Sequence, residues 1–345
     1  MLIRRIPIIL LFLAPSLPSI ALAHHSTRVF YNYDQVIEIE GTVTWVLWRN
    51  PHIRFNVTRT DGGNSKETWE LEAGSMNTLD RFGIGEGTIQ VGDVIRVAGR
   101  PSSHNLNTIY VSNVLFENGN EVSLQGSQTF RWTNKDTPSS PRTSGNEGEL
   151  VLPGVKGIFR VWIRGRGGRQ ENLPFTATAL EKREAWDPLT DDPALRCIPP
   201  GMPSAMDNPY PIAFTSEDNE IILHLEEWDG LRTIHMDSSA ITDNLSGTRM
   251  GYSVGRWEEN TLIVSTTNIN YPYFDSIGTP QSKAVEILEH FTLSEDDRRL
   301  DYRMIITDPE TFTAPAEFIQ HYIWEPREEI KSYECTLVEQ LQTQN

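Results

Sequence analysis

Short runs in which apolar and polar residues alternate dominate the chain. Such a run covers residues 36–46, and shorter ones follow at 53–57, 69–72, 94–97 and 109–114. A two-residue period is typical of β-strands with one buried face. Five short strands with one helical insertion near residues 75–82 predict a small OB-like barrel over residues 24–120.

A second series of strand-like runs is spaced as in hairpins. It comprises residues 157–162, 212–215, 220–227, 231–237, 252–258, 261–268, 284–293, 300–307 and 318–324. The best helix candidate is Thr176–Trp186, because Asp187-Pro188 would end a helix there. We expect a mainly β second domain over residues 154–340, either a lipocalin-like antiparallel barrel or a curved sheet with one helix. A β-sandwich is the alternative.

The two series are separated by residues 121–153. Most of this stretch is rich in Ser, Thr, Gly, Asn and Pro and poor in apolar residues. That composition is typical of a solvated linker. We therefore place the domain boundary there.

The first 23 residues have the pattern of a secretory signal peptide. Arg4 and Arg5 precede the short apolar run Ile6–Leu13, and Ala21-Leu22-Ala23 fits a cleavage site. No later stretch has the length of a membrane helix. We expect a periplasmic or secreted protein with no membrane insertion after cleavage.

Charge and cysteine content narrow the possible partners and the redox state. The net charge of −17 disfavours binding to nucleic acid, so a small molecule is the expected partner. Cys197 and Cys335 are the only cysteines. In an oxidising compartment an isolated pair is expected to form a disulfide.

Cleavage after Ala23 would make His24 the first residue of the mature protein. A terminal amine and its own imidazole can chelate one ion together, and imidazole ligands suit copper. His25 and the distant His52, in Asn50-Pro51-His52, would complete a copper site. The alternative is a solvated terminus with two histidines and no ligand.

The dipeptide Asp229-Gly230 favours a two-residue type I′ turn. That turn would pair Glu227 with Arg232 and His224 with His235 across the hairpin. One face would then carry His224, Glu226, His235 and Asp237. Such a face can do acid–base chemistry, bind a metal or simply be solvated.

The sharper interpretation assigns roles to these side chains inside a barrel. Glu226, Arg232, His235 and Asp237 are the candidate catalytic residues. His224, His290 and Asp308 are candidates for lining a ligand pocket, the last two from later strands. This interpretation requires the polar face of the hairpin to point into the barrel.

Two sets of motifs resemble exported bacterial proteins of unknown function. Ala23-His24-His25-Ser26, Tyr33-Asp34, Gly41-Thr42-Val43 and Asn50-Pro51-His52 resemble an N-terminal domain family. Cys197-Ile198-Pro199-Pro200-Gly201-Met202-Pro203 and Gly255-Arg256-Trp257-Glu258 resemble a C-terminal β-domain that often follows it. The second resemblance supports Glu226, Arg232 and Asp237 more than His235 or His290, which depart from its pattern. Neither implies an established activity.

Three functions remain open at this point. The first is a periplasmic protein that binds copper through its N-terminal histidines and a small ligand in its second domain. The second is a cofactor-free lyase, isomerase or hydrolase that acts in the second barrel. The third is an interaction module without chemistry.

Overall fold

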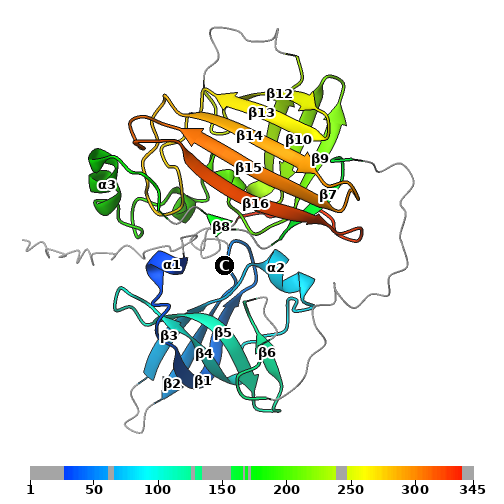
Figure 1. The fold of residues 1–345 in the computed structure, drawn as a ribbon. Helices are drawn as coiled ribbons and strands as arrows, with labels where there is room; N and C mark the ends of the chain where they lie inside the picture. The colour runs from blue at the N-terminus through cyan, green and yellow to red at the C-terminus, as the bar shows by residue number, and fades with distance from the viewer. Residues whose placement is uncertain are drawn as a thin grey trace, which may run out of the picture.

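The computed structural model describes residues 27–60, 66–125, 129–133, 157–165, 168–169, 172–237 and 247–335. These residues form two β-barrels, one above the other in Figure 1. Most of the predicted linker and all of residues 1–26 lie outside the described residues. Among the helices of the described ranges, none combines the length and apolarity that a membrane crossing requires.

The first barrel follows the short helix α1 (Thr27–Phe30). Its strands are β1 (Ile37–Leu47), β2 (Arg54–Thr60), β3 (Lys66–Glu72), β4 (Val94–Pro101), β5 (Thr108–Phe116) and β6 (Glu121–Ser123). The order is β3-β2-β1-β4-β5, a parallel pairing of β3 with β5 closes the ring, and β6 extends β5. The helix α2 (Met76–Arg81) connects β3 to β4. The predicted OB-like barrel is confirmed.

Strand β1 is long enough to serve both halves of this barrel. Residues 37–42 pair with β4, and residues 42–47 pair with β2. The two pairings overlap beside Gly41, where an added Cβ atom would lie 2.6 Å from the carbonyl oxygen of Thr58. Only glycine permits so close an approach. Ile39 and Val43 are buried on the inner face, as the alternation predicts.

The second barrel is a closed ring of nine strands. They are β7 (Val161–Arg164), β9 (Ile212–Glu217), β10 (Glu220–Leu225), β11 (Gly230–His235), β12 (Tyr252–Glu258), β13 (Thr261–Thr267), β14 (Glu286–Leu293), β15 (Arg299–Thr307) and β16 (Ala316–Trp324). β16 pairs with both β15 and β7 and so closes the ring; the short β8 (Gly168–Arg169) also pairs with β16. Neighbours are antiparallel except β11 and β12, which run parallel over two residue pairs. The predicted antiparallel barrel is therefore confirmed apart from this one pair.

The helix predicted for the second domain is α3 (Ala177–Glu184). Thr176 caps it, because its hydroxyl accepts a hydrogen bond from Ala179 N at 3.2 Å. Three 3₁₀ turns also belong to this domain: η1 (Pro193–Arg196), η2 (Ser204–Met206) and η3 (Glu227–Asp229). They lie in the connections between strands.

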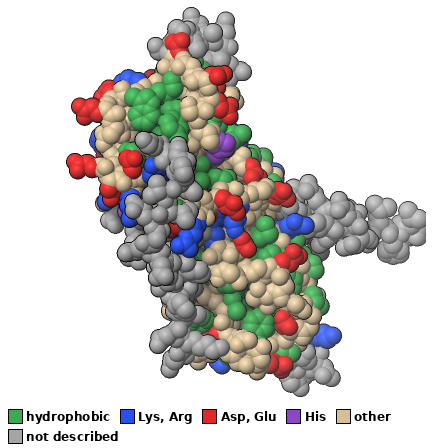
Figure 2. All heavy atoms as spheres, turned by 90° about the vertical axis from the view of Figure 1, so that its right-hand side faces the viewer, with side chains coloured by type: hydrophobic (Ala, Val, Ile, Leu, Met, Phe, Trp, Pro, Cys, Tyr) green, Lys and Arg blue, Asp and Glu red, His purple; other side chains and the backbone are tan. Residues whose placement is uncertain are grey.

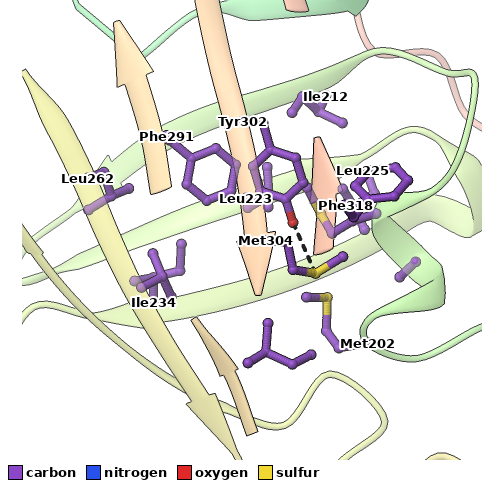
Figure 3. Packing of buried hydrophobic residues seen from close by; sticks show 14 of the residues in the cluster. Met202, Ile212, Leu223, Leu225, Ile234, Leu262, Phe291, Tyr302, Met304 and Phe318 are labelled. Atoms are coloured by element: carbon purple, nitrogen blue, oxygen red, sulfur yellow. Dashed lines mark hydrogen bonds between the residues drawn. The ribbon is translucent and has the colours of Figure 1, made fainter. Parts of the chain in front are cut away.

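Side chains fill the interior of the second barrel. In Figure 3, Phe291 and Tyr302 lie side by side in this core, with Leu223, Ile234 and Met304 around them. The ring centroids of Phe291 and Tyr302 are 4.6 Å apart, and all five side chains are buried. The middle of the barrel is thus a packed core.

A buried ion pair lies in the same core. Arg232 donates to both carboxylate oxygens of Glu289, and Tyr302 donates to Oε1 of Glu289 at 2.8 Å. The hydroxyls of Ser253 and Thr266 accept the remaining guanidinium bonds at 3.0 and 2.7 Å. Because each charge meets several partners, burial of the pair is tolerated.

The hairpin between β10 and β11 differs from the predicted one. Leu225 pairs with Gly230, so residues 226–229 form a four-residue loop, and His235 lies opposite Glu220. The predicted two-residue turn and its register are wrong. The carboxylate of Asp229 accepts the backbone N–H groups of Tyr333 and Glu334 at 2.9 and 3.1 Å. These distant contacts override the local preference of Asp-Gly.

The observed register differs from the predicted one by four residues, an even number, so the side chains that remain in the two strands keep their predicted faces. Leu223 and Ile234 point into the core, as does Arg232. His224 and His235 lie on the outer face of the barrel, where they are partly exposed. The polar face of the hairpin therefore does not line the interior.

Candidate ligand site at the junction of the two barrels

The C-terminal tail, residues 325–335, contacts both barrels. Cys335 forms a disulfide with Cys197, which confirms the predicted pairing. Asn50 of the first barrel forms a β-bridge with Cys335 and donates from Nδ2 to Tyr333 O at 2.6 Å. The disulfide thus anchors the segment of the tail that contacts the loop between β1 and β2. In OB barrels this loop commonly contributes to the ligand-binding face.

Glu226 joins the second barrel to the first. Both of its oxygens accept hydrogen bonds from the guanidinium of Arg81 on α2. Asn77 Nδ2 and Lys331 N also donate to it, at 3.1 and 3.0 Å. Glu226 is fully buried. The hydrogen bonds of the Glu226 carboxylate therefore hold the two barrels together.

Charged side chains surround this contact on the surface. Figure 2 shows the molecule from the side of α2, with acidic and basic groups gathered at the waist between the barrels. Two ion pairs join the barrels near this contact, the nearly buried pair of Arg81 with Glu328 and the more exposed pair of Lys331 with Asp80. The interface is polar at its rim.

A cavity of about 140 Å³ lies beside the junction. Segments of η1, η2, η3 and the loop of residues 271–276 surround it, all from the second domain. Its aromatic walls are Trp186, Trp228, Tyr271 and Tyr273. We call this cavity the junction pocket.

The segment that forms one wall of the junction pocket also touches the first barrel. Leu195 of η1 packs in one cluster with Phe30 and Tyr31, which lie at the end of α1 and just after it. On another side, the ring of Trp228 lies 5.5 Å from that of Tyr333 in the tail. The shape of the pocket thus depends on how the two barrels meet.

Four carboxyl groups line the junction pocket. Asp192 accepts a bond from Ala194 N at 3.0 Å, and Asp275 accepts bonds from three donors in residues 277–279. Asp207 forms an ion pair with Arg164 at 3.2 Å. The fourth group is Glu227. None of the described lining residues is basic.

Glu227 has the most perturbed carboxyl group of the four. Removal from water raises the pKa of Glu227 to about 7, and the charges of His52 and Arg164 oppose that rise. His52 belongs to the first barrel, so the two barrels are coupled electrostatically at this wall of the pocket. A carboxyl group that titrates near neutrality is common at functional sites.

His52 lies at the edge of the first barrel, after the cis bond between Asn50 and Pro51. Its Nδ1–H donates to Ala73 O at 3.0 Å, and Nδ1 is 3.5 Å from Glu72 Oε1. This bond fixes the tautomer, so Nε2 is the nitrogen that can bind a metal. His24 and His25 lie outside the described residues. Within those residues, no three His, Cys, Asp or Glu side chains form a metal-binding group.

The other predicted site residues are spread over the second domain. Arg232 lies in the core, whereas Glu226 lies at the junction. His235 is on the outside, 2.8 Å from Glu220, with its ring stacked on Tyr252. Asp237 is exposed at the end of the same strand. The structure does not bring the four candidate catalytic residues together.

The three candidate pocket residues are also separate. His224 bonds the hydroxyl of Thr215 at 3.0 Å, and His290 lies on the outer face of β14. Asp308 is buried and holds a turn by accepting bonds from Ser282 and Thr311. None of the three lines the junction pocket.

The sequence patterns do not point to the residues that form this pocket. Its aromatic walls come from Trp186, Trp228 and the Tyr271-Pro272-Tyr273 stretch. The sequence feature that could identify them is the presence of large aromatic residues beside acidic ones in loops, where binding residues concentrate. The spatial convergence of these loops is not visible in the sequence.

The fold and the site define a two-barrel β protein with an OB-type first barrel and a pocket of about 140 Å³ at the junction. Residues 13–110 match a family of unknown function, DUF6152, which confirms the N-terminal resemblance. The match spans α1 to β5 and begins before the described residues. No curated protein matches the chain.

Proposed function

We propose that the protein is exported and binds a small molecule in the junction pocket. The observation that carries this proposal is Glu227, a carboxyl group with a pKa near neutrality in a cavity with aromatic walls. Ligand sites commonly combine an apolar or aromatic lining with a few convergent polar groups. Export is supported by the predicted signal peptide and by the disulfide.

The size of the pocket limits what it can take. Sites for drug-sized ligands measure roughly 300–1,000 Å³. At about 140 Å³, the junction pocket accommodates a small molecule or one end of a larger one. The middle of the second barrel is filled by packed side chains, whereas a larger cavity of about 420 Å³ lies beside Phe291 and Leu293.

Fragment binding tests the proposal. Neutral, cationic and anionic fragments would be screened by tryptophan fluorescence and calorimetry against the wild type and Ala194→Phe, which fills the pocket. Ala177→Phe, on the exposed surface of α3, is the matched control. We expect millimolar binding of one class that only Ala194→Phe abolishes. Absence of binding, or binding unchanged in Ala194→Phe, would contradict the proposal.

Copper binding by His24, His25 and His52 is a second candidate function. Two observations favour it. The tautomer of His52 leaves Nε2 as the ligating atom. Tyr110 contacts both His52 and Tyr31, with ring centroids 6.3 and 5.4 Å away. The N-terminal arm therefore runs close to His52, and the three residues from His24 to Thr27 can span about 10 Å.

Copper titration of the mature protein tests this candidate. We expect His52→Ala, or one alanine added before His24, to weaken Cu(II) binding by about tenfold or more. His224→Ala, on the outer face of the second barrel, is the control. Equal copper affinity in the alanine-extended protein would exclude the N-terminal chelate.

A further inference from the structure

The aromatic walls of the junction pocket stand nearly at right angles. The ring planes of Trp186 and Tyr273 meet at 70°, with centroids 6.4 Å apart. Those of Tyr273 and Tyr271 meet at 81°, with centroids 6.1 Å apart. Rings inclined at these angles border a corner, whereas stacked rings would lie parallel to one another. A rounded group held between them meets more than one ring face.

The charge of the pocket adds a second constraint. Asp192, Asp207, Glu227 and Asp275 contribute carboxyl groups, and the described lining residues include no Lys, Arg or His. Burial above all, and then the charge of Asp192, raises the pKa of Tyr271. The charges of Asp192 and Asp275 therefore act at the aromatic wall itself, where Arg249 offsets them in part. An anionic ligand would be repelled there.

We propose that the junction pocket takes an organic cation, with an ammonium group held between Trp186, Tyr271 and Tyr273 and facing the carboxyl groups. This rests on the proposed function, because it names the ligand class of the same site. Faces of Trp and Tyr rings attract ammonium groups, and sets of such rings are a common means of binding quaternary amines. The carboxyl groups supply the long-range part of the attraction.

A bare metal ion fits these walls less well than an ammonium group. Asp275 is held by backbone and hydroxyl donors of residues 277–279, and Asp207 by Arg164. Their oxygens are therefore partly committed to the protein. Metal ions require several oxygen ligands at close range. An alkylated ammonium needs no such ligands and gains from contact with the rings.

Tetramethylammonium chloride is the probe that tests the charge assignment. Calorimetry would compare it with tert-butanol, a neutral compound of similar shape, and with sodium acetate. We expect tetramethylammonium to bind at least about tenfold more tightly than tert-butanol. Sodium chloride at matched concentration controls for ionic strength.

Variants locate the binding. Tyr273→Leu is expected to weaken tetramethylammonium binding about tenfold, whereas Tyr273→Phe, which keeps the ring, stays within about threefold of the wild type. At pH 8, above the pKa of Glu227, Glu227→Gln keeps the shape and removes the charge, so it should weaken binding of the cation and leave tert-butanol binding unaffected. Circular dichroism confirms that each variant is folded.

The outcomes separate this inference from the proposed function. Binding of tert-butanol or acetate as tight as that of tetramethylammonium, lost in Ala194→Phe, overturns the cation assignment and keeps the ligand site. Tetramethylammonium binding that Tyr273→Leu leaves unchanged also overturns it. If none of the three probes binds, the cation inference fails, and the wider fragment panel decides whether the pocket is a site at all.

Discussion

Arg81 of the first barrel and Glu226 of the second form a buried ion pair in which both carboxylate oxygens accept hydrogen bonds from one guanidinium. Glu226 is the first residue of the loop of residues 226–229, and the residue after it, Glu227, lines the junction pocket. The contact that joins the barrels therefore also positions one wall of the candidate site.

Breaking this pair should destabilise the protein strongly. Arg81→Met leaves the Glu226 carboxylate buried without its main partner, a loss of about 3–5 kcal/mol in the free energy of unfolding. Denaturant unfolding measures the loss. Arg303→Met, which removes the exposed pair with Glu317, is the control and should change the same quantity by less than about 1 kcal/mol. Similar losses in both variants would contradict the role given to Glu226.

Removing the disulfide should release the tail from the junction. Replacing Cys197 and Cys335 by serine opens a loop whose ends are 138 residues apart. The chain-entropy relation sets the loss at up to about 5 kcal/mol. We also expect faster proteolysis within residues 325–335, because Asn50 would hold the freed tail less firmly. Limited proteolysis followed by mass spectrometry checks this, and unchanged cleavage of the tail would count against it.

The stability of the protein should depend on pH through Glu227. Its folded-state pKa of about 7 lies above that of an unfolded glutamic acid, so the folded form holds a proton that the unfolded chain has lost. The stabilisation is complete below the unfolded pKa and is lost as the pH rises through about 7. The stabilisation that depends on the Glu227 proton is at most about 3 kcal/mol.

Thermal unfolding between pH 4 and 8 measures this dependence. Glu227→Gln should flatten the fall in stability, whereas Glu181→Gln, on the exposed surface of α3, should leave it as in the wild type. If the stability of Glu227→Gln falls with pH as much as that of the wild type, groups other than Glu227 cause the pH dependence.

Substitutions in the second barrel separate structural from functional roles among the predicted site residues. Arg232→Met leaves Glu289 buried and unpaired, and we expect a loss of about 3–5 kcal/mol in unfolding free energy. His235→Ala removes a partly exposed pair with Glu220 and should cost less than about 1 kcal/mol. Neither change touches the junction pocket. A loss of fragment binding in folded His235→Ala would contradict the location of the site.

Regular elements could be predicted where local pattern and tertiary structure agree. The alternation along β1 identifies Ile39 and Val43 as core residues, and the helix predicted before Asp187-Pro188 is α3. The pairing of Cys197 with Cys335 follows from the presence of just two cysteines and from the oxidising compartment that the signal peptide predicts. In these cases the prediction depends only on neighbouring residues in the sequence, on the alternation of faces along a strand, or on a single partner residue.

The candidate site could not be predicted in the same way. Glu227 and Trp228 lie in a loop that Tyr333 and Glu334, about one hundred residues later, hold open through Asp229. The sequence favours a tight Asp-Gly turn there, and the tail overrides it. The sequence predicts Glu226 to lie beside two histidines, but its partner is Arg81, on a helix of the other barrel. Such contacts depend on how the barrels meet.

A crystal structure of the protein soaked with the fragments that bind in solution would locate the ligand site. We expect ligand density in the junction pocket, bounded by Trp186, Tyr273 and Glu227. Ligand density confined to other parts of the molecule, with the junction pocket filled only by solvent, would contradict this expectation.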